Sequence, residues 1–406
     1  MIPHAVIVGG GMITHDQLLP SLFQLVRQGD IGDIAVCGLT GRVVTSLAQA
    51  EAIRRAFPDQ RFRPYPGPDA DQDTPQPALY REVIGNLPPD SLVVIALPDD
   101  LHYDAILAAL GAGHHVVSVK PLVLSAAQAE EIEREALARG LFVGIEYHKR
   151  FDDRSLMARQ LYRQGRFGEF RLGTARLFEK WHYQHSNFQN WFTVGRTDPF
   201  TYIGCHYVDL VHFITGLTPS AVSVYGIPGK FPNGNEGYLW SDARVIWENG
   251  ACLNVQNGLT FPDAAPGPNT QGISLYCAGE GVGALIEHSD QYRGLKYCYT
   301  EAPQGPGATQ YAEPSPDYFL YVDLGGTGLA PVGYGVRSVH ALARAAAGVA
   351  CARSLAERQE VLRAIDAAGV LATPANSRYN GFVIEAARAS LACGGREIPV
   401  GRGFPA

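Results

Sequence analysis

No apolar run in this 406-residue sequence approaches the roughly 18–20 residues that a helix needs to cross a bilayer. The first residues also lack the basic segment and cleavage pattern of a secretion signal, so we expect the folded protein to begin at residue 1. Lysine and arginine number 33 against 40 acidic residues, a net charge of −7, which disfavours bulk binding of nucleic acid. These features predict a cytoplasmic protein with neither a membrane nor a nucleic-acid partner.

The seven cysteines are dispersed, and none forms a C-x-x-C pair. This spacing argues against a disulfide framework or a zinc site, so we expect no metal and mostly free thiols buried in the core. Hydrophobic residues make up 46% of the chain and charged residues 18%, which excludes a disordered protein. The length predicts two or three domains.

Short apolar runs alternate with helix-patterned segments over the first 150 residues. The run at 92–97 is continuously apolar, as expected of a strand that is buried on both faces of a parallel sheet. The segment 58–77 is rich in Pro, Asp and Gln and predicts an exposed loop. This alternation predicts an α/β, Rossmann-like, doubly wound parallel sheet. Its other strands are expected at 4–8, 33–37, 115–119 and 141–146, and its helices at 16–28, 42–57, 101–113 and 126–139.

The pattern changes after residue 150. A hairpin signal, Glu248-Asn249-Gly250, separates two of the strand candidates, and hairpins imply antiparallel pairing. We therefore predict an α+β second domain with a large, mostly antiparallel open sheet and C-terminal helices, the domains being 1–148 and 149–406. Its strands are expected at 171–178, 220–225, 241–247, 251–257, 273–278 and 284–288, and its helices at 336–349, 355–368 and 380–392.

A glycine-rich turn, GGGMIT at 9–14, follows the first predicted strand. In a dinucleotide fingerprint the first glycine makes a tight turn and the second lets the pyrophosphate approach the backbone. Two of the three glycines match and Thr14 stands at the third position, so an ordinary turn of another α/β fold is the alternative. The residues expected to contact the dinucleotide are Gly9, Gly11, Met12 and Ile13.

The end of the second strand usually distinguishes NAD from NADP, because a carboxylate there binds the ribose hydroxyls. The sequence CGLTGR at 37–42 contains no acid. Thr40 offers a hydrogen bond to ribose or phosphate. Arg42 either pairs with a 2′-phosphate or is a solvated residue of the first helical turn. The cofactor is therefore NAD or NADP.

Three segments carry a family resemblance: LPDDLH at 97–102, AGHHVVSVKP at 112–121 and YIGCHYVD at 202–209. They are similar to the T-P-N-x-x-H, A-G-K-H-V…E-K-P and D-x-G-x-H-x-x-D patterns of the Gfo/Idh/MocA oxidoreductases, the relatives of glucose–fructose oxidoreductase and inositol dehydrogenase. Three of the departures from these patterns bear on the expected site. Val119 replaces the family's Glu, Asp99 its Asn, and Tyr202 its acid.

The resemblance implies an NAD(P)-dependent dehydrogenase that acts on a hydroxyl of a sugar, cyclitol or glycoside. We expect His206 to act as the base, Lys120 to hold the hydroxyl oxygen near the nicotinamide, and Tyr202 to donate to substrate or relay a proton. Read singly, Lys120 is better explained as a surface lysine before a proline and His206 as a core histidine. Tyr202 is equally a packing aromatic. Further cofactor contacts are expected from Pro98, Asp99, His102 and Lys120.

Two further segments suggest substrate contacts. In GIEYHKR at 144–150, Lys149 stands where relatives contact substrate hydroxyls. The stretch 179–192 combines aromatic rings with amides and imidazoles, a mixture typical of sugar sites, although a packed crossover or a subunit contact is the alternative. The expected substrate-binding residues are Lys149, His182, Trp191, Tyr202 and His206.

The resemblance also implies a homodimer or homotetramer formed through the open face of the second domain's sheet. Domain 1–148 would bind NAD(P), and domain 149–406 would bind substrate and form the oligomer. The alternatives are a glycosidase or epimerase that uses tightly bound NAD for transient oxidation, a ketone or imine reductase, and a non-catalytic cofactor-binding regulator. Retention of Lys120 and His206 argues against the regulator.

Overall fold

The computed structural model describes residues 1–265, 267–289, 297–300, 309–312 and 317–401. They form two compact units, Met1–Phe151 with Tyr321–Gly381, and Asp152–Leu320 with Phe382–Ala406. The predicted division assigned every residue after 148 to the second domain. The structure differs, because Tyr321–Gly381 belongs to the first unit.

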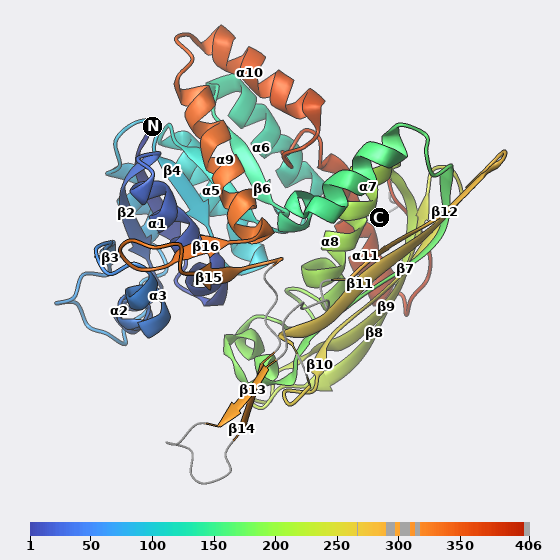
Figure 1. Ribbon diagram of the computed structural model, residues 1–406, viewed down its shortest axis with the longest axis horizontal. Coiled ribbons are helices and arrows are strands. Elements are labelled where there is room, and N and C mark those ends of the chain that lie inside the picture. The colour runs from blue at the N-terminus through green and yellow to red at the C-terminus, as the bar shows by residue number, and fades with distance from the viewer. Residues whose placement is uncertain (266, 290–296, 301–308, 313–316, 402–406) are drawn as a thin grey trace. The chain divides into compact units, whose positions relative to one another are not determined.

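The first unit is built on a parallel sheet with the strand order β3-β2-β1-β4-β5-β6 (Figure 1). Successive strands run outward from β1 on one side and from β4 on the other, so the order reverses between these two neighbours. This topology confirms the predicted Rossmann-like fold, in which ligands bind where the order reverses. The strands are β1 (Ile2–Val8), β2 (Ile31–Cys37), β3 (Arg63–Tyr65), β4 (Leu92–Ile95), β5 (His115–Val119) and β6 (Val143–Glu146).

Helices connect these strands, and two more return from the C-terminal part of the chain. The connecting helices and turns are η1 (Thr14–Leu18), α1 (Leu19–Arg27), α2 (Gly41–Gln49), α3 (Glu51–Ala56), α4 (Leu79–Gly85), η2 (Asp99–Leu101), α5 (His102–Gly111), α6 (Ala126–Arg139) and η3 (His148–Phe151). The late elements are β15 (Leu320–Val322), β16 (Ala330–Val332), α9 (Tyr334–Ala350) and α10 (Leu355–Ala368).

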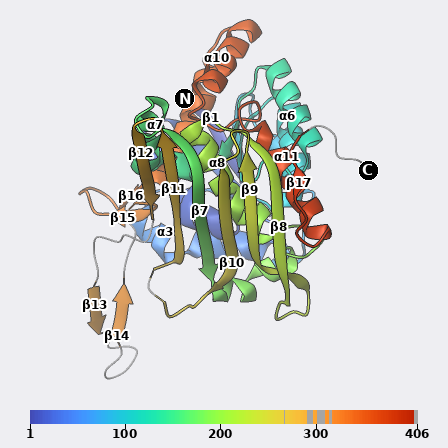
Figure 2. The same cartoon turned by 90° about the vertical axis from the view of Figure 1, so that its right-hand side faces the viewer.

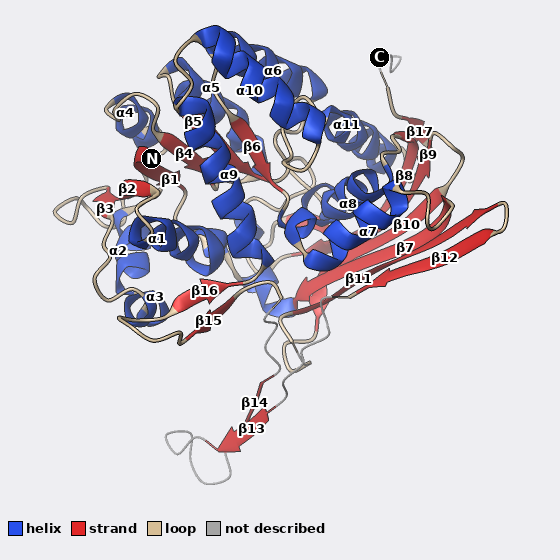
Figure 3. Cartoon of the chain, turned by 45° about the horizontal axis from the view of Figure 1, so that its top comes forward, coloured by secondary structure: helices blue, strands red, loops and turns tan. Residues whose placement is uncertain are grey.

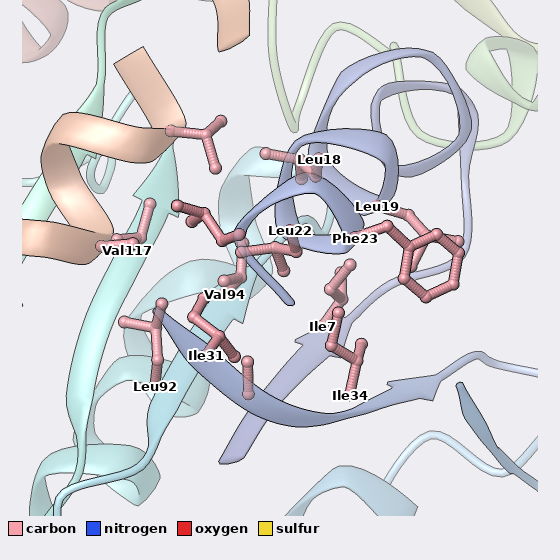
Figure 4. Packing of buried hydrophobic residues seen from close by; sticks show 14 of the residues in the cluster. Ile7, Leu18, Leu19, Leu22, Phe23, Ile31, Ile34, Leu92, Val94 and Val117 are labelled. Carbon is pink, nitrogen blue, oxygen red and sulfur yellow. The ribbon is translucent and has the colours of Figure 1, made fainter. Parts of the chain in front are cut away.

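The core of this unit explains why α9 belongs to it. Leu18, Leu22 and Phe23, from η1 and α1, pack against the strands in one cluster (Figure 4). Val339 and Leu342 of α9 are buried in the same cluster. Full burial of each large aliphatic side chain contributes roughly 1.5–3 kcal/mol to folding stability. Helix α9 therefore helps to stabilise the parallel sheet of the first unit.

Three local predictions need correction. The segment 58–77 is not entirely loop, because it contains β3, which pairs with β2 at the edge of the sheet. The helix expected at 42–57 is broken at Ala50, whose ψ of 116° is not helical. The sequence reading also missed α4 (Leu79–Gly85).

The second unit contains a larger sheet with the strand order β12-β11-β7-β10-β9-β8-β17. All neighbouring pairs are antiparallel except β7 and β10, which confirms the mostly antiparallel prediction. The predicted hairpin joins β9 to β10, with Gly250 at a φ of +79°. The strands are β7 (Glu169–Lys180), β8 (Pro219–Lys230), β9 (Glu236–Trp247), β10 (Cys252–Phe261), β11 (Asn269–Gly279), β12 (Val282–His288) and β17 (Ile398–Pro399), with β13 (Tyr297–Thr300) and β14 (Thr309–Ala312) as a separate pair.

Helices cover one face of this sheet, and the other face is open. Helices α7 and α8 lie side by side, and the turn η6 that precedes α8 contacts β7, β9 and β10 (Figure 3). The broad open face is seen in Figure 2, and Leu172, Tyr225 and Tyr276 are about half exposed. The helical elements are α7 (Asp153–Arg163), η4 (Trp181–His185), η5 (Asn187–Asn190), η6 (Phe200–Gly204), α8 (Cys205–Thr215) and α11 (Arg378–Ala392), the last spanning the boundary at Gly381.

The cysteines lie partly outside the core. Six are free thiols, and the side chain of Cys298 lies outside the described residues. Cys351 and Cys393 are exposed, so the expectation of core burial is wrong for them. Among the described residues, no helix is both long and apolar enough to cross a membrane.

Candidate active site

The glycine-rich turn sits between β1 and η1, at the point where the strand order reverses. Gly9 has a φ of +115°, and a methyl group there would lie 2.0 Å from the carbonyl oxygen of Ala96, so only glycine fits. No described atom lies within 4 Å of the corresponding position at Gly11. A side chain at Gly11 would therefore fill open space in front of the backbone, a cradle at the position where the pyrophosphate approaches in a dinucleotide fingerprint.

Thr14 takes a structural role at the third glycine position. Its buried hydroxyl donates to the Gly9 carbonyl at 2.7 Å and ties the turn to the helix that follows. That helix begins with the π-helical turn η1, a rare conformation that is frequently found at functional sites. Met12 is exposed, whereas Ile13 packs against the core cluster.

The turn after β4 is tied to the turn after β5 through His102. Its ring is completely buried, with Nε2 2.8 Å from the Leu97 carbonyl oxygen and Nδ1 2.8 Å from that of Pro121. Asp99 is buried in the same turn, which begins at Pro98. The observed contacts of His102 therefore brace the segment that carries Lys120.

Lys120 directly follows β5 and is half-buried, with a cis peptide bond to Pro121. Its neighbour Val119 stands where the family has a carboxylate. Val119 pairs in register with Glu146 of β6, a buried acid that accepts from Gln17 Nε2 at 2.8 Å. A carboxylate thus reaches this end of the sheet from the adjacent strand, and no pattern in the sequence links the two positions.

His148 and Lys149 follow β6 in the turn η3. The His148 Nδ1 atom lies 3.1 Å from Glu146 Oε2. Lys149 is buried, which is unusual for lysine and marks a site where its charge is engaged. Among the predicted residues, Lys149 and Lys120 therefore both follow strands at the carboxyl end of the same sheet.

The end of β2 carries Thr40 and Arg42. Thr40 is the N-cap of α2, where its Oγ1 accepts from the backbone amide of Val43 at 3.4 Å. Arg42 forms an ion pair with Asp73, from the loop after β3. Sequence reasoning missed Asp73 because it lies in a segment read only as a polar loop.

Tyr202 and His206 lie in the second unit, on η6 and the first turn of α8. The backbone amide of Tyr202 donates to the Asp198 carbonyl at 2.9 Å. The buried Asp198 carboxylate accepts from the amide and the hydroxyl of Thr201 at 2.9 and 2.6 Å, and burial raises its pKa. Asp198, four residues before Tyr202, therefore anchors the π-helical turn η6 just ahead of its first residue, Phe200.

Gly204 lets this helix approach the sheet. A methyl group there would lie 2.7 Å from the Phe200 ring and 2.8 Å from Asn257 Oδ1 on β10. His206 follows two residues later and is buried with only 6% of its surface exposed. The glycine of the motif is thus required by packing, and the packing sets where His206 lies.

An aromatic cluster surrounds Tyr202. The rings of Phe188, Trp191 and Phe192 lie 5.3, 5.5 and 5.6 Å from the Tyr202 ring, each edge-on. Edge-to-face contacts at these distances are favourable. The structure therefore brings two predicted substrate residues, Trp191 and Tyr202, into contact.

His182 is held elsewhere in this segment. Its side chain is exposed, and its backbone amide and Nδ1 both lie about 3 Å from Asp263 Oδ1. Lys180 anchors the same loop by donating to the carbonyl oxygens of Pro262 and Asp263 at 3.1 Å. These hydrogen bonds tie His182 to the loop that follows β10.

The architecture thus has two parts, a Rossmann unit with a glycine cradle and a unit with an open, mostly antiparallel sheet. The chain matches the family model "Oxidoreductase family, NAD-binding Rossmann fold" over residues 4–147 and the "GFO/IDH/MocA C-terminal domain" over residues 155–277. The chain belongs to the Gfo/Idh/MocA oxidoreductase family and has its NAD(P)-binding fold.

Curated relatives match only part of their length. The chain is 30% identical over 124 residues to the scyllo-inositol 2-dehydrogenase (NADP(+)) IolW of Bacillus subtilis, covering 30% of each protein. It is 26% identical over 223 residues to the D-glucoside 3-dehydrogenase of Escherichia coli, covering 54% of this chain and 55% of the relative.

Solved structures match over nearly the full chain. GenD2 from gentamicin A biosynthesis, in complex with NAD, has a TM-score of 0.64 at 17% identity and covers 98% of this chain and 97% of that one. Scyllo-inositol dehydrogenase from Lactobacillus casei, with NAD(H) and scyllo-inositol, has a TM-score of 0.61 at 15% identity and covers 98% and 99%. At these identities the likeness establishes a shared fold.

Proposed function

We propose that this protein transfers a hydride between a hydroxyl-bearing carbon of a sugar, cyclitol or glycoside and the nicotinamide of NAD(P). The observation that carries the proposal is that this member of an oxidoreductase family has Lys120 at the end of β5 and His206 after the close-packed Gly204. The relatives' names point to the substrate class, because they include an inositol dehydrogenase and a glucoside dehydrogenase.

The cradle at Gly11 and the first turn of η1 would hold the pyrophosphate, with Met12 and Ile13 beside it. Pro98, Asp99 and Lys120 would line the nicotinamide end, and Thr40 and Arg42 the ribose end. The expected cofactor contact from His102 is replaced by a bracing role, because its ring is completely buried against backbone carbonyls. When bound, the nicotinamide accepts or returns the hydride. The assigned residues directly follow the carboxyl ends of β1, β2, β4 and β5, and ligands of parallel sheets bind at these strand ends.

In the oxidation direction, His206 takes the hydroxyl proton on an imidazole nitrogen as the hydride leaves the same carbon. The Lys120 ammonium donates a hydrogen bond to that oxygen and stabilises its developing negative charge. Reduction of the carbonyl reverses both steps. Tyr202 replaces an acid, so its phenol can donate a hydrogen bond to substrate or pass a proton but supplies no negative charge at neutral pH.

Trp191, Lys149 and His182 are proposed to contact the remaining hydroxyls and ring faces. Trp191 is supported by its contact with Tyr202, and Lys149 by its burial after β6. His182 has weaker support, because its ring is paired with Asp263. We also propose a cytoplasmic homodimer or homotetramer assembled through the open sheet face.

The test is an absorbance screen of sugars, inositols and glycosides with NAD and NADP, followed by variants. Lys120→Ala and His206→Asn should each lower kcat by about 10²–10⁴-fold while NADH binding stays measurable. Lys230→Ala and His4→Asn are matched controls outside the site and should keep wild-type rates. Wild-type rates in either site variant would refute the assignment. Release of aglycone from a chromogenic glycoside without added cofactor would refute simple dehydrogenation.

A further inference from the structure

The end of β2 lacks the acid that NAD-binding sheets of this type place there, yet a carboxylate comes to the same place from a distant loop. We propose that Asp73 selects NAD(H) over NADP(H) in this protein. The inference rests on the proposed function only in taking a dinucleotide as the ligand.

Backbone hydrogen bonds on both sides of Asp73 position the loop. The amide of Arg42 donates to the Gln72 carbonyl at 2.9 Å, and the amide of Gln76 donates to the Leu39 carbonyl at 2.7 Å. Residues 72–76 therefore run beside residues 39–42, the segment that leaves β2 and starts α2. This arrangement puts Asp73 next to the cofactor-selecting end of the strand.

The side chain of Gln72 reinforces this position. Its Oε1 accepts from Thr45 Oγ1 at 2.9 Å, and its amide group would lie 2.7 Å from a methyl group placed at Gly41. Gly41 thus lets the loop pack directly on the first turn of α2. The position of Asp73 is set by several independent contacts of its neighbours.

Asp73 engages the cation that would otherwise be available for a phosphate. Arg42 Nε donates to Asp73 Oδ1 at 2.7 Å and Nη2 to Oδ2 at 2.8 Å, a bidentate pair. Both side chains are about 70% exposed, so the pair adds little to folding stability. Its importance lies in the charge that it presents at the surface.

NADP differs from NAD by a phosphate on the adenosine ribose. A carboxylate accepts hydrogen bonds from the free hydroxyls of NAD but repels the phosphate of NADP. Asp73 also occupies the planar donor fork of Arg42, which is the group suited to bidentate phosphate binding. Both effects favour NAD, although Arg42 alone would favour NADP.

The test measures equilibrium binding of NADH and NADPH by calorimetry, with no substrate present. In Asp73→Asn the Kd for NADPH should fall by about tenfold, because a like charge within one Debye length is removed and Arg42 is released. The Kd for NADH should rise several-fold. Asp69→Asn, an exposed acid on the same loop, is the control and should leave both constants unchanged. In the double variant Asp73→Asn, Arg42→Ala, the Kd for NADPH should no longer be lower than in the wild-type protein.

Equal changes in Asp69→Asn and Asp73→Asn, or an unchanged ratio of the two constants in Asp73→Asn, would overturn the inference. A lower Kd for NADPH than for NADH in the wild-type protein would also overturn the inference. Binding of NADH without turnover of any sugar, cyclitol or glycoside would contradict the proposed function alone. Failure of the wild-type protein to bind either dinucleotide would overturn both.

Discussion

His115, the first residue of β5, should make this protein less stable as the pH falls below neutral. Its Nδ1 accepts the backbone amide of Phe142 at 3.0 Å, and its Nε2 lies 3.5 Å from Asp90 Oδ1. Burial lowers the pKa of His115 from 6.5 to about 4. A protonated ring has no lone pair for the Phe142 amide, so the fold holds the neutral form.

The size and sign of the effect follow from the pKa difference. Above the unfolded pKa of 6.5, the ring is neutral in both states and its contribution to stability is fully present. Between 6.5 and about 4 the unfolded chain binds a proton that the folded protein does not, so the free energy of unfolding falls with pH. A difference of about 2.5 pKa units at 1.36 kcal/mol per unit gives about 3 kcal/mol.

The assay compares urea unfolding of the wild-type protein and His115→Asn at neutral pH and at about pH 4. Asparagine does not titrate, and its side-chain oxygen can accept the Phe142 amide in place of Nδ1. Between neutral pH and about pH 4, the free energy of unfolding should fall by about 3 kcal/mol more in the wild type than in the variant. The contributions of all other titrating groups cancel in this difference. The same pH dependence in both proteins would show that His115 titrates alike in the folded and unfolded states.

Three further predictions concern glycines. Gly9→Ala should cost about 3 kcal/mol of stability, because its methyl group would lie 2.0 Å from a backbone oxygen at a φ of +115°. Gly11→Ala should keep the wild-type Tm but raise the Kd for NADH by about tenfold, and similar behaviour of the two variants would contradict the cradle. Gly204→Ala should lower kcat by about tenfold by pushing η6 away from Asn257, whereas Asn257→Ala in the same chain should restore part of the activity. No recovery in the double variant would argue against this contact.

The sequence alone determined those features of the protein that depend on the conformational preferences of neighbouring residues. Gly9 has a positive φ, the apolar run at 92–97 supplies the buried strand β4 (Leu92–Ile95), and Asn249-Gly250 favours a tight hairpin. Each feature depends on residues close together in the chain. The cofactor turn and the two sheet types follow from such signals. The family motifs at Lys120 and His206 were visible for the same reason.

Tertiary structure decided the features that depend on residues far apart in the sequence. Helix α9 joins the first unit because its apolar face completes the core of that sheet, not because of any signal near residue 148. Glu146 comes beside Val119 through strand register, and Asp73 reaches Arg42 because its loop packs on α2. Periodicity reports which face of an element is buried but not its partner, so only the packed structure shows which carboxylate faces the end of β2.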